Sequence, residues 1–302
     1  LCFGGLHYDD MIRCEADTIL NESNPVSRTR APGGVALNVA RTLAALGNTV
    51  GLSSRVGADR EGVELLDYLT RLGITAVSIQ TDNTHATARY TAVLDHTSNL
   101  ILGLADMGIY DDFKPAHWQH SRQDIEHWDY WCVDTNLPVD TLHYLASEKA
   151  AQMLFAVVTS PAKAHRLRQL LPMLDAVFVN RAEASILVNS NTGAPQTIEE
   201  QARALCDLGA LRAIVTAGAD GAAWACPDSF GHIDCPTINP QSVSGAGDVL
   251  AGTTMAALLS GETLEQALTY GTCAATLSTL SDMNDPQLSW SMIKDNLVHN
   301  DA

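Results

Sequence analysis

Short apolar runs alternate with helically spaced apolar residues through most of this 302-residue chain. Apolar residues recur every three or four positions from Val35 to Leu46, and Gly47 follows where a helix would end, so the spacing predicts a helix over 35–46. The same spacing predicts helices over 63–72, 142–151, 197–208 and 249–259. Short runs predict strands over 49–53, 129–134, 153–158, 176–179 and 212–216. Strands separated by helices imply an α/β fold, in which helices cover both faces of a parallel sheet.

The stretch 86–105 breaks this rhythm, because its apolar residues alternate with a period of two. Residues 95–99 supply turn chemistry, and the alternation then resumes at Leu100. The pattern predicts a β-hairpin that projects from the α/β body, and segment 11–30 is a candidate to pair with it. We therefore expect one domain over 1–302, with a small lid formed by about 11–30 and 86–105.

Composition narrows the classes of partner. Lys and Arg number 18 against 35 Asp and Glu, so the net charge is −17. Such a balance repels nucleic acid and anionic membranes, and no apolar run is long enough to span a bilayer. The seven cysteines form no C-x-x-C pair, which favours reduced thiols in the cytoplasm over a disulfide framework. No secretory leader is visible, and since Leu1 is not an initiator Met, we expect residues to precede it.

Two glycine-containing motifs open predicted helices. Gly33 and Gly34 precede the helix that carries Asn38, whose amide can donate to and accept from a polyhydroxylated ligand. A tight turn with a surface Asn is the alternative interpretation. The stretch Ser244 to Gly247 precedes Asp248, so main-chain amides suited to a phosphoryl oxygen would lie beside a carboxylate. That carboxylate would serve as a base, or simply complement the helix dipole.

Three further motifs follow predicted strands. Asn180 and Glu183 are spaced to share one helix face, where they would hold hydrated Mg²⁺ near phosphates or form an ordinary N-terminal cap. The segment Thr216 to Gly221 is a glycine-rich loop that would lie along a nucleotide or make a hairpin turn. Asp9 follows the first strand, where a carboxylate would bind sugar hydroxyls or begin a loop. None of the motifs is a Walker A or G-x-G-x-x-G sequence.

The order of these motifs is more specific than any one of them. Asp9, G-G-x-x-x-N, N-x-x-E, T-x-G-x-x-G and G-A-G-D occur in that order, and the first signature also matches at Ala40, Gly47 and Gly57. In this the chain resembles the ribokinase-like (PfkB) family of carbohydrate kinases across essentially its whole length. The resemblance implies a doubly wound α/β body with a β lid, and ATP-dependent phosphorylation of a hydroxyl on a small sugar or nucleoside.

The resemblance also implies a role for each motif residue. Asp248 would be the catalytic base, with an anion hole formed by Gly245, Ala246 and Gly247. The phosphate acceptor would be bound by Asp9, Gly33, Gly34 and Asn38. ATP would be bound by Asn180, Thr216, Gly218 and Gly221, and Glu183 would hold Mg²⁺ through water. The family often has an acidic residue or Asn where this chain has Ser242, at a monovalent-cation site, so K⁺ dependence stays open.

Within the family, the chain is most similar to pseudouridine kinases, in short stretches around the lid and after a central strand: Ser23-Asn24-Pro25, Leu94-Asp95, Ala105-Asp106-Met107 and Asp134-Thr135-Asn136. This likeness implies pseudouridine as the acceptor and pseudouridine 5′-phosphate as the product. Kinases that act on ribose, fructose or adenosine share every motif and are the alternative, and a non-catalytic nucleoside-binding regulator is another. Exposed lid strands would also allow two copies to pair as a homodimer.

Overall fold

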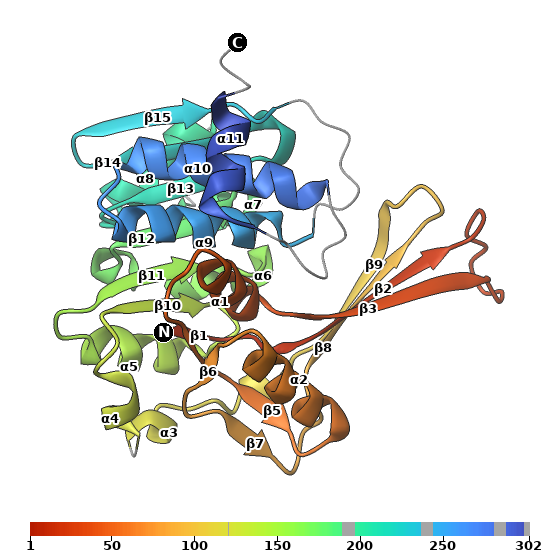
Figure 1. Cartoon of the computed structure of the whole chain (residues 1–302). Coiled ribbons are helices and arrows are strands. Elements are labelled where there is room, and N and C mark those ends of the chain that lie inside the picture. Colours follow the sequence, from red (N-terminus) through yellow and green to blue (C-terminus); the bar gives the residue numbers. More distant parts are fainter. Residues whose placement is uncertain (120, 189–196, 237–243, 281–287, 299–302) are drawn as a thin grey trace.

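The computed structural model describes residues 1–119, 121–188, 197–236, 244–280 and 288–298 (Figure 1). Its main sheet has nine strands, from one edge to the other β15 (Ser229–Ile233), β14 (Ala222–Cys226), β13 (Ala213–Thr216), β12 (Ala176–Asn180), β11 (Met153–Val157), β10 (Tyr130–Asp134), β1 (Cys2–Phe3), β4 (Gly51–Ser53) and β6 (Thr75–Ala76). Neighbouring strands are parallel except for the pairs β13–β14 and β14–β15. The predicted α/β fold with a mainly parallel sheet is confirmed.

Side chains of the central strands alternate between two hydrophobic cores, as the pleat requires. Cys132 and Phe155 belong to one core, whereas their neighbours Trp131 and Leu154 belong to the other. The first core is covered by α1 (Val35–Ala45), α2 (Arg60–Arg71), α9 (Ala246–Leu259), α10 (Leu264–Thr279) and α11 (Trp290–Val298). The second is covered by α5 (Val139–Glu148), α7 (Arg181–Val188), α8 (Ile198–Asp207) and the short α3 (Ala116–Gln119), α4 (Arg122–Ile125) and α6 (Pro161–Ala164).

A second sheet extends away from this body as a lid (Figure 1). Its order is β3-β2-β8-β9, with β2 (His7–Cys14), β3 (Val26–Gly33), β8 (Arg89–Leu94) and β9 (Leu100–Asp106). The strands β2 and β8 are parallel, and each pairs with its other neighbour in antiparallel fashion. The expected lid segments 11–30 and 86–105 contribute to these strands, but β2 begins earlier and β3 continues to Gly33. The lid therefore starts next to the glycine motif.

Smaller elements complete the described chain. A separate parallel pair consists of β5 (Arg55–Gly57) and β7 (Gln80–Asp82). Single 3₁₀ turns are η1 (Gly108–Tyr110), η2 (His165–Leu167), η3 (Leu171–Met173) and η4 (Gly218–Asp220). The predicted helix 63–72 begins three residues early, because the Asp59 side chain caps it by accepting from the Gly62 N–H. None of the helices in the described part of the chain has both the length and the apolar character needed to cross a bilayer.

Candidate active site

Helix α9 begins with main-chain amides turned toward open space. Gly245 caps the helix at φ 75°, in the left-handed region that favours glycine, and its carbonyl accepts from the Asp248 N–H at 3.0 Å. The N–H groups of Ala246 and Gly247 donate to no acceptor among the described residues. A Cβ placed on Gly247 would meet no atom within 4 Å. The helix therefore offers unpaired donors and its positive end to an anion, with room for one.

The first turn of α9 also positions Asp248 against α1. Gly252 allows the two helices to approach closely, because a Cβ there would lie 2.8 Å from the Thr42 Cβ. Asn38 donates through its Nδ2 to the Asp248 Oδ2 at 2.7 Å, and Arg41 donates to the Asn38 Oδ1 at 3.0 Å. Since Arg41 can only donate, it fixes which end of the Asn38 amide faces Asp248.

The electrostatic surroundings of Asp248 suit a proton acceptor. Burial raises the pKa of Asp248 to about 7, the hydrogen bond from Asn38 opposes the shift, and the negative charges of Asp134 and Asp9 add to it. A carboxyl with a pKa near neutrality can both take a proton from a hydroxyl and release it to water afterwards. The start of α1 links Asp248 to Asp134, because Asp134 accepts from the Ala36 N–H and Asn38, two residues further along, donates to Asp248.

Asp134, at the carboxyl end of β10, fixes the turn on which the acceptor motifs depend. Its Oδ2 accepts from the Gly5 N–H at 2.8 Å and from the Ala36 N–H at 3.1 Å, which ties the end of β1 to the start of α1. Burial raises the pKa of Asp134, and these N–H groups act in the opposite direction. A Cβ on Gly4 would lie 2.2 Å from the Asp134 Cγ, so only glycine fits there. The sequence had indicated this residue only through the likeness to pseudouridine kinases.

The predicted acceptor residues lie around that turn. A Cβ on Gly33 would be 2.1 Å from the Asp9 Oδ2, so the Asp9 carboxylate lies directly against the Gly33 backbone. Gly34 has φ 106° and comes so close to Gly5 that an added Cβ would be 2.4 Å from the Gly5 carbonyl oxygen. The buried His7 places its Nε2 3.2 Å from the Asp9 Oδ1, a contact that no sequence motif had indicated. The lid root and α1 thus present polar groups to one region beside Asp248.

Three of the four predicted ATP residues line a common cavity of about 350 Å³, and the fourth, Asn180, does not line it. Its polar wall includes Thr216, Gly218 and Gly221 from the loop after β13, together with Ala246 and Gly247. Apolar residues make up much of the remainder: Ala219, Ala222, Pro236, Leu250 and Ala275. Gly221 has φ 82°, and a Cβ there would lie 2.2 Å from the Ile233 carbonyl oxygen. An apolar slot that ends at unpaired amides fits a nucleobase and its phosphates.

Asn180 and Glu183 form a reciprocal cap at the start of α7. The Asn180 Oδ1 accepts from the Glu183 N–H at 2.9 Å, and the Glu183 Oε2 accepts from the Asn180 N–H at 2.8 Å. Burial raises the pKa of Glu183 to about 7. Asn180 is also the strand neighbour of Thr216, which lines the cavity. Across the described ranges, no three His, Cys, Asp or Glu side chains gather as a metal site, so Mg²⁺ would be held chiefly by phosphates and water. Ser242 lies outside the described residues.

Comparisons with known proteins identify the family of this chain. Residues 5–285 match the model of the pfkB family carbohydrate kinases. The pseudouridine kinase of Escherichia coli is 24% identical over 89% of this chain and 86% of its own length. A carbohydrate kinase from Agrobacterium tumefaciens has a similar structure, with TM-score 0.84 and 31% identity over 98% of this chain and 96% of that one. A putative ribokinase II from E. coli, in complex with ATP and Mg²⁺, has TM-score 0.80 and 16% identity over 99% and 98% of the two chains. The chain belongs to the pfkB family of carbohydrate kinases.

Proposed function

We propose that this kinase transfers the γ-phosphoryl group of ATP to a primary hydroxyl of a nucleoside, and that its acceptor is pseudouridine. One observation carries the reaction: the Asp248 carboxylate lies beside the unpaired N–H groups of Ala246 and Gly247, at the wall of the nucleotide cavity. The relative from E. coli that acts on pseudouridine, and the stretches around the lid that resemble such kinases, support the choice of acceptor.

In the proposed reaction, Asp248 takes the proton of the acceptor hydroxyl as its oxygen attacks the γ-phosphorus. The bond between that phosphorus and the bridging oxygen breaks, and ADP leaves. Charge on the transferred phosphoryl group is stabilised by the N–H groups at 246 and 247, which need no rearrangement to act. Asn38 holds the Asp248 side chain in place, while Asp9 and the backbone at Gly33 and Gly34 bind the acceptor.

ATP and Mg²⁺ are the co-substrate and the metal that we assign to this site. The fit of ATP rests on the 350 Å³ cavity and on the amides at its wall. Mg²⁺, when bound, would neutralise phosphate charge, and we assign Glu183 to it through water because the α7 cap engages only one of its two carboxylate oxygens, Oε2. Asn180, whose Oδ1 accepts from the Glu183 N–H, would hold Glu183 in place. K⁺ dependence is a matter for assay, since Ser242 lies outside the described residues. All seven cysteines are free thiols, which supports the expected cytoplasmic setting.

The acceptor is tested by measuring ADP release with pseudouridine, ribose, fructose, adenosine and uridine as separate acceptors. The proposal predicts the highest kcat/KM for pseudouridine, with a phosphate on its 5′ oxygen in the product. A higher kcat/KM for ribose, fructose or adenosine would reassign the acceptor within the family. Absence of transfer to all five would favour a nucleoside-binding regulator.

We also propose that the lid forms a homodimer. The lid edge strand β9 exposes about half of each of four large apolar side chains, Leu100, Ile101, Leu102 and Leu104. An unpaired apolar edge of this kind favours strand or face pairing with a second copy. Sedimentation should show a dimer for the wild type and a monomer for the double variant Leu102→Lys, Leu104→Lys. A monomeric wild type at micromolar concentration would reject this arrangement.

A further inference from the structure

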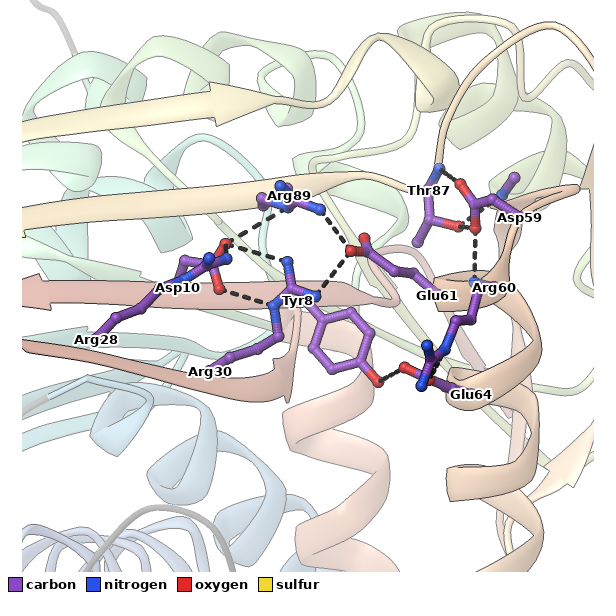
Figure 2. A network of polar contacts seen from close by, with 12 residues as sticks. Tyr8, Asp10, Arg28, Arg30, Asp59, Arg60, Glu61, Glu64, Thr87 and Arg89 are labelled. Atoms are coloured by element: carbon purple, nitrogen blue, oxygen red, sulfur yellow. Dashed lines mark hydrogen bonds and ion pairs between the residues drawn. The ribbon is translucent and has the colours of Figure 1, made fainter.

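Three arginines of the lid converge on one buried carboxylate. Asp10 is 2% exposed and lies on β2, where its Oδ2 accepts from the Arg28 NH2 at 2.6 Å and its Oδ1 from the Arg30 Nε at 2.8 Å. The Arg89 Nε, on β8, lies 3.5 Å from the Asp10 Oδ2. Figure 2 shows these side chains gathered across the three strands. Asp10 therefore holds β2, β3 and β8 together at the root of the lid.

Two of these arginines also reach the body of the enzyme. Glu61, in the first turn of α2, accepts through its Oε1 from the Arg30 NH1 at 2.8 Å and from the Arg89 NH2 at 2.5 Å (Figure 2). Arg30 and Arg89 thus each bridge Asp10 of the lid and Glu61 of the body. One carboxylate oxygen on α2 ties two lid strands at once.

A second tie lies closer to the point where β8 leaves the body. Asp59, the cap of α2, accepts from the Thr87 N–H at 2.7 Å and from the Thr87 Oγ1 at 2.6 Å. The Thr87 Oγ1 in turn accepts from the Gly57 N–H at 3.0 Å. These contacts fix the chain just before β8, so they act as a pivot. The contacts of Glu61 with Arg30 and Arg89 lie further out along the lid strands than this point.

The contact between Asp10 and Arg30 favours the charged form of both groups. Burial alone would raise the pKa of Asp10, but the hydrogen bonds from Arg30 and Arg28 outweigh it and hold that pKa below its usual value. The Asp10 hydrogen bond raises the pKa of Arg30, and so does Glu61. The Arg30 guanidinium also lies 4.9 Å from the centre of the Tyr8 ring, which favours the charged form. Salt should weaken mainly the partly exposed contacts of Glu61 with Arg30 and Arg89, and affect the buried Asp10 less.

Strand geometry links this cluster to the acceptor site. Asp9 and Asp10 are neighbours on β2, so their side chains point to opposite faces of the lid. The Asp10 face carries the arginines, and the Asp9 face places its carboxylate against Gly33. A change in lid angle at Glu61 would therefore move Asp9 relative to the acceptor, without touching the nucleotide cavity.

We propose that Glu61 is a positioning residue that holds the lid, through Arg30 and Arg89, at the angle where Asp9 meets the acceptor. The inference rests on the proposed role of Asp9 in acceptor binding. Without the Glu61 charge, the lid would spend less time at this angle, and the apparent affinity for the acceptor would fall in proportion to that lost population. Affinity for ATP and the rate at saturation would change little.

The test compares Glu61→Gln with Glu64→Gln. Glu64 lies one turn along α2 and is a matched control, because among the described residues it contacts no arginine of the lid. Its one contact with the lid is a long hydrogen bond of 3.4 Å from the uncharged hydroxyl of Tyr8 on β2, and its other partner is the exposed Arg60. We expect Glu61→Gln to raise the KM for the acceptor by about 10- to 100-fold, the range for lost hydrogen bonds to charged groups, while the KM for ATP, kcat and Tm stay close to those of the control. Glu61→Asp should give an intermediate KM. Added salt should raise the wild-type acceptor KM more than that of Glu61→Gln.

A second measurement does not depend on catalysis. Hydrogen exchange of the β2 and β8 amides should be faster in Glu61→Gln than in Glu64→Gln, with unchanged exchange in β10 to β13. Failure of the wild type to phosphorylate any acceptor would reject the proposed function, and exchange would still decide whether Glu61 holds the lid. Equal lid exchange in the two variants would overturn the inference. The inference would also be overturned if Glu61→Gln lowered kcat, the affinity for ATP and Tm together with the affinity for the acceptor.

Discussion

Asn38 should set the pH range in which this enzyme works. Its amide donates to the Asp248 Oδ2 at 2.7 Å and holds down a pKa that burial has raised to about 7. A hydrogen bond to a charged group contributes about 1.5–3 kcal/mol, and one pKa unit corresponds to about 1.4 kcal/mol. Because Asp248 is half-buried, water would replace part of the lost bond. We therefore expect Asn38→Ala to raise the pKa of Asp248 by about one unit, toward 8.

The assay is kcat/KM for the acceptor at saturating ATP, measured across neutral pH. The active form of a base is the deprotonated one, so the wild-type rate should rise about tenfold per pH unit below pH 7 and level off above it. In Asn38→Ala the rising limb should move to higher pH, beneath a lower plateau that reflects weaker acceptor binding. Asn48→Ala, which changes an amide at the other end of α1, should leave the midpoint in place. A lower plateau with an unmoved midpoint would refute the link between Asn38 and the protonation of Asp248.

Two further predictions concern the same site. Gly221→Ala should raise the KM for ATP strongly, because Gly221 has φ 82° and the new Cβ would lie 2.2 Å from the Ile233 carbonyl oxygen. Gly218→Ala should have the smaller effect, because Gly218 has φ 59° but open space around the new Cβ. Titration of the two variants with nucleotide compares their affinities. Asp248→Asn should raise Tm more at pH 8 than at pH 4. The folded pKa of Asp248 is raised, so its contribution to stability is present below the unfolded pKa and is lost as pH rises through 7; equal Tm shifts at both pH values would contradict this.

Local patterns in the sequence anticipated the body of the fold and the place of the site. Apolar runs between helical repeats predicted the parallel strands, and the carboxyl ends of such strands meet at one edge. For that reason motifs far apart in the sequence, such as those of Asn38 and Asp248, face each other in the structure. The sequence motif could not show that Asn38 contacts Asp248 itself, because this contact depends on the close approach of α1 and α9 at Gly252.

Other features have no local pattern from which to be predicted. Helix α10 went unpredicted because it is rich in small residues and is buried between neighbours, so it lacks one apolar stripe. The hairpin-turn interpretation of Thr216 to Gly221 is confirmed, because this loop joins the antiparallel strands β13 and β14, but the strand–helix alternation does not predict that β15 extends the sheet further. The ties of Glu61 to Arg30 and Arg89 join segments about 30 residues apart. At Asn180 and Glu183 the cap is observed, and the role in Mg²⁺ binding stays a prediction.

The central claim is that Asp248 removes the proton from the acceptor hydroxyl. Its most direct test is the single-turnover rate of phosphoryl transfer by Asp248→Asn, measured together with the affinity for ATP. We predict a rate lowered by roughly 10²–10⁴, with ATP bound about as tightly as by the wild type. Transfer at close to the wild-type rate by a variant that binds ATP normally would contradict the assignment of Asp248 as the base.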